Sequence, residues 1–190
     1  LNGGTDKELT MYWARVAQPH FSLALDVLVD VLLHSTFDPL EIEKERQVII
    51  EEMHMTKDSP SAQVHEINDA LLWPNHPLGW DIAGTPASVA GVDRGKMLNY
   101  LRNKYLPSNT VVTIAGNIEH DVAVEAVRQA TGSWTNRQSC PVFLPYQEQP
   151  NPRLKIEKRE IEQAHFCLSL PGYSLFHPKR YALGLLNVIL

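Results

Sequence analysis

The chain has 190 residues, of which 44% are hydrophobic and 21% are charged, and its formal net charge is −5. These values are typical of a globular protein with one domain, or with one domain and part of a second. With 17 basic against 22 acidic residues, the chain has no basic surplus to neutralise phosphates, which argues against a nucleic-acid partner. No apolar run approaches the roughly 20 residues that a membrane-spanning helix needs.

The N-terminal third of the sequence predicts a strand followed by three helices. Residues 9–17, LTMYWARVA, carry the aromatic and β-branched side chains that are typical of a strand. Pro19 opens the first helix, because proline suits a first turn. Asp38 is a suitable N-cap for the second helix, which should end near residues 58–60. A third helix is expected over about 61–72.

The middle of the sequence predicts loops, short helices and one buried strand. Residues 74–86 are rich in proline and glycine and predict a loop. Thr85 and Asp93 are suitable N-caps for two short helices. Residues 109–118, NTVVTIAGNI, predict a buried strand, and residues 120–130 predict an amphipathic helix.

The C-terminal part of the sequence predicts a domain boundary. Four prolines and little periodicity mark the segment that ends at residue 153. We expect a first domain over 1–138, a linker over 139–152 and the start of a second, similar domain over 153–190. The second part should begin with two strands and end with a helix. The whole order predicts an α+β fold, in which helices cover a mixed or antiparallel sheet.

The two ends of the sequence predict a piece of a longer protein. Residue 1 is Leu, and the final YALGLLNVIL stops inside a helical apolar pattern without a stop signal. Leu183, Leu186 and Leu190 share one stripe of that last helix. An exposed apolar face of this kind favours association, so we expect the 190-residue piece to self-associate.

The predicted second helix carries an unusual arrangement of carboxylates. At 100° per residue from Glu45, Glu52 lies near 340°, between Val48 at roughly 300° and Ile49 at roughly 40°. Glu45 and Glu52 are therefore expected on one apolar face, two turns apart, whereas Glu51 lies on the polar face. A carboxylate on a buried face needs a partner, because burying it alone is costly.

Two kinds of partner are consistent with these residues. One is an Arg or Lys in an ion pair, and the other is a metal or a reacting group. The sequence contains neither HExxH nor HxxEH, and the nearest pattern places Asp69 four residues after His65. It also contains no GxSxG elbow and no phosphate-binding glycine loop. The residues alone leave both kinds of partner open.

Several segments together resemble the insulinase/pitrilysin family. They are NGGTDKELTMYWARV, ERQVIIEEM with the following DSP, HPLGWDIAGTPASVAG, YLPSNTVVTIAGNI and QAHFCLSLPGYSLFHPKRYALGLLNVIL. The segments agree with the family's motifs in order and spacing, and the resemblance covers nearly the whole chain.

The resemblance implies a zinc metallopeptidase of the inverted-motif class. In that family HxxEH supplies two histidine ligands and a glutamate base, and a later glutamate completes the zinc shell. Glu52 matches that third ligand, and Glu45 matches an acidic residue that acts one shell further out. Because the 190 residues contain no HxxEH, we expect zinc in the intact protein, but neither tight zinc binding nor peptidase activity in this piece alone.

The resemblance also implies a peptide substrate. Asn2, Gly3 and Thr5 match the edge strand along which the family holds extended peptides, a mode that suits substrates of varied sequence. They could equally belong to an ordinary edge strand. The remaining half of the peptidase would lie in the same chain or in a partner subunit. The competing function is that of a non-catalytic paralogue, a structural or substrate-holding partner of an active subunit.

Overall fold

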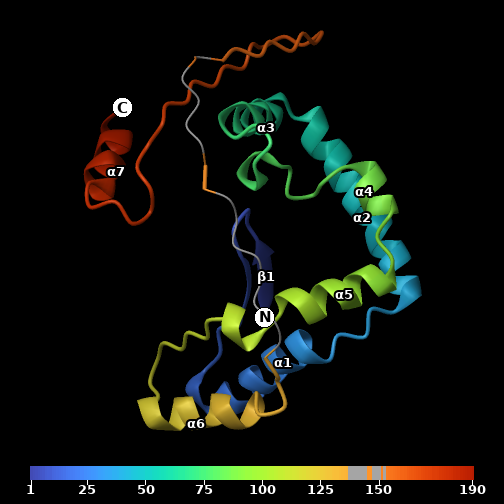
Figure 1. Ribbon diagram of the computed structural model, residues 1–190, viewed down its shortest axis with the longest axis vertical. Helices are drawn as coiled ribbons and strands as arrows, with labels where there is room; N and C mark the ends of the chain where they lie inside the picture. Colours follow the sequence, from blue (N-terminus) through green and yellow to red (C-terminus); the bar gives the residue numbers. More distant parts are fainter. Residues whose placement is uncertain (137–144, 147–150, 152) are drawn as a thin grey trace.

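The structure is a computed structural model that describes residues 1–136, 145, 146, 151 and 153–190 (Figure 1). The strands and the α-helices are β1 (Asn2–Thr5), β2 (Thr10–Trp13), α1 (Phe21–Leu33), α2 (Pro39–Asp58), α3 (Pro60–Leu72), α4 (Pro86–Ala90), α5 (Arg94–Lys104), α6 (His120–Ala130) and α7 (Arg180–Ile189). Short 3-10 helices span Gln18–His20, Pro77–Gly79 and Pro107–Asn109. Helices and an antiparallel strand pair together agree with the predicted α+β class.

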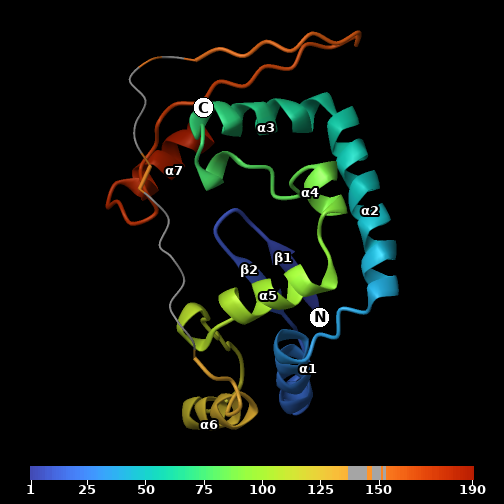
Figure 2. The ribbon, with the colours of Figure 1, turned by 45° about the vertical axis from the view of Figure 1, so that its right-hand side comes forward.

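The two strands form an antiparallel hairpin. Asn2 lies opposite Trp13 and Thr5 lies opposite Thr10, and the amide of Asp6 donates to the carbonyl of Leu9 at 2.8 Å to close the turn. Figure 2 shows this hairpin inside a frame made by α3, α2 and α5. The strand predicted over 9–17 is confirmed but ends at residue 13.

The helix starts follow local signals that the sequence predicts. The Asp38 carboxylate accepts from the amide of Leu40 at 2.8 Å, which confirms it as the N-cap of α2. Thr85 and Ser88 form a reciprocal capping box at the start of α4, and Asp93 caps α5. The predicted helices near 61–72 and 120–130 and in the tail are confirmed as α3, α6 and α7.

Three predicted strands are not paired within the described residues. Residues 110–118 are irregular, and Val111 is 89% exposed, so the prediction of a buried strand is wrong for this part of the chain. Residues 154–172 run out and back as two extended arms above α3 without ladder bonds (Figures 1 and 2). A strand needs backbone pairing with a neighbour, and within the described residues only β1 and β2 form such a ladder.

The core is small. Val29 of α1, Ala123 of α6 and Leu106 are the buried hydrophobic residues among those described. The accessible surface is 15593 Å², against roughly 9000 Å² for a compact monomer of the same mass by size scaling. Apolar faces of several elements are therefore exposed. No described helix combines the length and the hydrophobicity needed to cross a membrane.

The predicted division into domains stays a prediction. The expected linker, 139–152, lies mostly outside the described residues. On its far side, Arg159 donates to the carbonyl of Lys57 at 2.6 Å and to the amide oxygen of Gln63 at 3.1 Å. The segment from 153 onward therefore contacts the end of α2 and the start of α3.

Candidate functional site

The two carboxylates that the sequence analysis selected lie on α2, which Asp38 caps and which runs for 20 residues. Glu45 and Glu52 are both exposed. The half-buried face of α2 is instead centred roughly 75° around the helix from Glu45. It carries Ile42, Arg46, Ile49, Ile50, Met53 and Thr56. In the described chain the two carboxylates therefore flank the packed face, and the prediction that they occupy its centre is wrong for these residues. Their metal-binding role stays a prediction.

Among the residues that the structure describes, Glu45 and Glu52 differ from the other glutamates of α2 in having no partner. Each of the others has a basic side chain one turn away: Glu41 with Lys44 at 2.6 Å, Glu43 with Arg46 at 2.9 Å and Glu51 with His54 at 3.8 Å. Within the described residues, neither Glu45 nor Glu52 makes a hydrogen bond or an ion pair. These two carboxylates are therefore available to a group that the described chain does not supply.

The predicted peptide-binding residues lie on β1. Asn2, Gly3 and Thr5 are exposed, and the outer edge of β1 faces no other strand in the described part of the chain. A Cβ atom added at Gly3 would lie 3.3 Å from the ring of Tyr12 on β2. Gly3 thus lets the Tyr12 ring lie close against β1, and the free edge of β1 offers backbone donors and acceptors.

A tyrosine pair fixes the hairpin to the end of α5. The hydroxyl oxygens of Tyr12 and Tyr105 are 3.0 Å apart, and their ring centroids are 6.4 Å apart. Burial raises the pKa of Tyr105 well above its usual range, and the hydrogen bond with Tyr12 raises it further. Tyr105 therefore stays neutral at physiological pH and keeps this contact.

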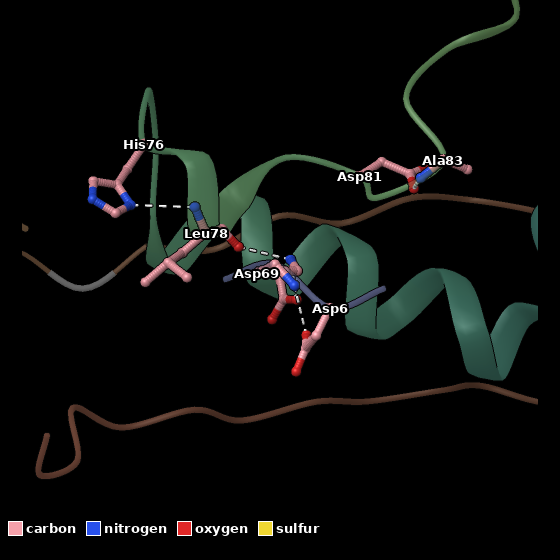
Figure 3. Close-up of polar contacts among 7 residues, drawn as sticks. Asp6, Asp69, His76, Leu78, Asp81 and Ala83 are labelled. Atoms are coloured by element: carbon pink, nitrogen blue, oxygen red, sulfur yellow. Dashed lines mark hydrogen bonds and ion pairs between the residues drawn. The ribbon is translucent and has the colours of Figure 1, made fainter. Parts of the chain in front are cut away.

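The turn of the hairpin is held by an ion pair. The Lys7 ammonium lies 2.6 Å from a carboxylate oxygen of Asp69 on α3 and donates to the carbonyl of Leu78 at 2.7 Å. Figure 3 shows the Asp69 carboxylate and the Leu78 carbonyl side by side, with His76 bound to the Leu78 amide at 3.2 Å. The Asp69 carboxylate and the Leu78 carbonyl thus hold the turn between β1 and β2 in place.

A half-buried acid, Glu66, lies on the same helix as Asp69. Burial raises the pKa of Glu66, and the nearby charge of Asp81 raises it further. The hydrogen bond from Gln63, at 2.5 Å, opposes this rise.

The weak histidine pattern noted in the sequence does not form a metal site. Asp69 is bound to Lys7, and His65 instead lies 4.0 Å from the sulfur of Cys167. The residues that the structure describes contain no group of three or more His, Cys, Asp or Glu able to hold a metal. Glu52 fits zinc as one oxygen ligand, and a catalytic zinc site needs two more protein ligands.

Sequence reasoning missed the roles of Lys7 and Arg46. Lys7 reaches a partner 62 positions away, which no local pattern could indicate. The apolar pattern of α2 also gives no sign that Arg46 is packed, because arginine side chains are mostly exposed. A cavity of about 270 Å³ lies between the ends of α1 and α5 and residues 133–135, which follow α6, and none of the predicted site residues lines it.

Curated proteins from several organisms are similar to the whole chain. An uncharacterized zinc protease of Bacillus subtilis, YmxG, is 36% identical over 190 residues, which are 100% of this chain and 46% of that protein. An uncharacterized zinc protease of Mycobacterium leprae is 35% identical, with 100% of this chain and 43% of that protein covered. A probable mitochondrial-processing peptidase subunit beta of Arabidopsis thaliana is 29% identical, with 100% and 36% covered. The chain spans less than half the length of these relatives.

A solved structure and two family models agree with these relatives. The crystal structure of a putative M16-like peptidase from Alicyclobacillus acidocaldarius matches with a TM-score of 0.58 and 26% identity, over 68% of this chain and 30% of that one. The model described as insulinase, peptidase family M16, matches residues 1–86. The model described as the peptidase M16 inactive domain matches residues 91–190, more than half of the chain. The resemblance seen in the sequence is confirmed, and the chain belongs to peptidase family M16, the insulinase family.

Proposed function

We propose that the intact protein is a zinc-dependent endopeptidase that cleaves peptides or small unfolded polypeptides, with Glu52 as a zinc ligand. The observation that carries the proposal is a pair of exposed carboxylates, Glu45 and Glu52, two turns apart on one side of α2 and without a partner among the described residues. The family and the names of the bacterial relatives support zinc as the metal.

Each carboxylate has its own role in this proposal. Glu52 binds the metal directly, and Glu45 orients another ligand by a hydrogen bond or through its charge. When bound, zinc lowers the pKa of its water towards 7 and polarises the peptide carbonyl. The 190-residue segment supplies only one of the ligands in this assignment, so we still expect it alone to bind zinc weakly.

The edge of β1 is the proposed binding site for an extended peptide. A peptide placed beside Asn2, Gly3 and Thr5 would pair its backbone with the donors and acceptors of that edge, and it would replace the bond that the Gly3 amide donates to the Asn2 side chain at 2.8 Å. This mode reads little of the substrate's sequence, which suits a peptidase that acts on unfolded chains.

The rest of the peptidase comes from the same chain or from a partner subunit in this proposal. Subunits named mitochondrial-processing peptidase subunit beta are among the relatives. A second candidate function is that of a non-catalytic partner that holds substrate or supports an active subunit. The match of residues 91–190 to a model described as an inactive domain is compatible with both functions, because relatives named zinc proteases cover the same residues.

The test compares two neighbouring glutamates in the full-length protein. Glu52→Gln should remove bound zinc and peptidase activity together while the protein stays folded. Glu51→Gln is the matched control, because it makes the same chemical change at the adjacent position, on the side of α2 where Glu51 pairs with His54. Zinc content by elemental analysis and hydrolysis of an unstructured peptide are the readouts. Equal zinc content in the two variants would rule out Glu52 as the ligand, and wild-type protein without peptidase activity would favour the non-catalytic partner.

A further inference from the structure

Arg46 follows Glu45 in the sequence, and its side chain points from α2 towards α4. Its side chain is 16% exposed, whereas that of Lys44, on the same helix, is 71% exposed. A guanidinium that is withdrawn from water needs hydrogen-bond acceptors. Its acceptors indicate what this residue does.

The guanidinium has an acceptor on each side. One terminal nitrogen donates to the carbonyl of Val89, and the other donates to the carbonyl of Val92 at 2.8 Å. The Nε donates to the carboxylate of Glu43 at 2.9 Å. The planar guanidinium of Arg46 thus binds two backbone carbonyls at the end of α4. Glu43, which lies on α2 like Arg46, accepts from the third nitrogen and orients the guanidinium.

The end of α4 holds a second cation as well. The Lys96 ammonium, from α5, donates to the carbonyl of Gly91 at 2.5 Å. Carbonyls at the C-terminal end of a helix carry the negative end of its dipole and favour cations. The end of α4 is therefore a junction that receives Arg46 from α2 and Lys96 from α5.

The rotation of α2 about its own axis is weakly fixed by apolar packing. None of its 20 residues is fully buried, and Ile42, Ile49 and Met53 are only half-buried. A guanidinium fork has a fixed direction and binds paired acceptors in one orientation. Arg46 is thus the contact that best defines which side of α2 faces α4, and hence which side carries Glu45 and Glu52.

We infer that Arg46 is a positioning residue, which sets the direction of the Glu45 and Glu52 carboxylates by locking the rotation of α2 against the end of α4. The inference rests on the proposed role of Glu52. A helix rotation of about 20° moves a side-chain end by about 2 Å, given a helix radius of about 5–6 Å. Metal–ligand distances hold to about 0.2 Å, so such a rotation would disturb a zinc site.

The experiment measures zinc binding by the full-length protein. Arg46→Gln removes the fork and the charge, and Arg46→Lys keeps the charge but can reach only one carbonyl. Lys44→Gln is the matched control, since it removes a charge from the exposed side of the same turn. The readouts are the zinc Kd by competition with a chromogenic chelator, the visible spectrum of the cobalt-substituted protein and the thermal midpoint without metal.

Arg46→Gln should raise the zinc Kd about 10–100-fold, as the loss of an outer-shell partner does, and should change the cobalt spectrum. The zinc Kd of Arg46→Lys should lie between those of Arg46→Gln and the wild type, and the zinc Kd of Lys44→Gln should equal that of the wild type. A role in stability alone would lower the thermal midpoint of Arg46→Gln and leave its Kd and cobalt spectrum unchanged, which would overturn the inference.

Two further outcomes keep the test decisive. If Arg46→Gln does not fold, Arg46→Lys takes its place, and a folded Arg46→Lys with the wild-type zinc Kd would overturn the inference. Glu52→Gln is measured alongside. If it strips zinc while the Arg46 variants do not, only the positioning role fails. If it leaves the Kd unchanged, the ligand assignment fails and the positioning role with it.

Discussion

The Lys7 ammonium lies 2.6 Å from the Asp69 carboxylate and joins the turn of the β1–β2 hairpin to α3, across 62 positions of sequence. The two side chains are 20% and 33% exposed, and the same ammonium also binds the carbonyl of Leu78. Exposed ion pairs contribute little to stability. This pair is partly withdrawn from water, and its ammonium contacts both the Asp69 carboxylate and the Leu78 carbonyl. Loss of the ammonium should therefore make the hairpin less stable.

Lys7→Met should therefore loosen the hairpin. The change leaves a half-buried carboxylate and a carbonyl without their donor, which costs about 1–3 kcal/mol for such groups. Amide hydrogen exchange of residues 2–13 in the full-length protein should become faster. Lys44→Met is the control, because Lys44 forms an exposed pair within one turn of α2 and its loss should stay within about 0.5 kcal/mol. Equal exchange in the two variants would contradict this role of Lys7.

The raised pKa of Glu66 predicts that this side chain lowers the stability of the folded protein by an amount that depends on pH. Burial and then Asp81 raise its pKa in the folded protein, so the folded state holds this proton more tightly than the unfolded state does. Below the unfolded pKa of about 4.3 both states are protonated and the charge costs nothing. The penalty develops as the pH rises through the unfolded and then the folded pKa, and it is fully present above the latter.

Glu66→Gln should consequently raise the thermal midpoint at pH 7. It removes the charge and keeps a side-chain oxygen that can accept from Gln63. The gain should shrink as the pH is lowered through the folded pKa and vanish below the unfolded one. Midpoints of the two proteins across pH 3.5–7.5, a range of about one unit below and three above the unfolded value, test this. A difference that does not change with pH would show that charge burial is not its cause.

The local structure of this chain could be predicted from sequence to a large extent, whereas its long-range contacts could not. The caps at Asp38, Thr85 and Asp93 depend on neighbouring amides, so residue type and position were sufficient. The strand predicted over 109–118 depends on a partner strand, and a run of β-branched residues cannot indicate whether one is present.

The candidate site shows the same division. The helical spacing of Glu45 and Glu52 could be read from sequence, and so could their placement on one side of α2. The sequence could not indicate which side of α2 would be packed, because Arg46 occupies that face by binding the backbone carbonyls of Val89 and Val92 at the end of α4. A helical pattern of apolar residues does not predict an arginine on the packed face.

The tail should make the 190-residue segment associate with itself. Leu183, Leu186 and Leu190 of the last helical stripe are all exposed, and exposed apolar patches favour association. Light scattering should give a mass that rises with concentration. Leu186→Glu should lower that mass, whereas Gln163→Glu, which adds the same charge in the exposed bend between the extended arms, should not. A monomer at all concentrations would refute this prediction.

The last prediction separates Glu45 from Glu52 in the full-length protein. Both are exposed carboxylates without a partner in the described chain, so charge alone would make them equivalent. The proposed function makes them unequal, since Glu52 contacts the metal and Glu45 orients one of its ligands. Glu45→Gln should weaken zinc binding about 10–100-fold and lower activity, because an outer partner tunes a ligand without replacing it.

Glu45→Asp provides the finer test. It keeps the charge but withdraws the carboxylate by one methylene, so it should lower activity if Glu45 acts by a hydrogen bond of fixed length. It should leave activity near the wild type if Glu45 acts through its charge alone. Chelator competition and peptide hydrolysis on the same samples give both quantities. If Glu45→Gln lost as much zinc as Glu52→Gln, Glu45 would be a direct ligand, and the division of roles between the two glutamates would be wrong.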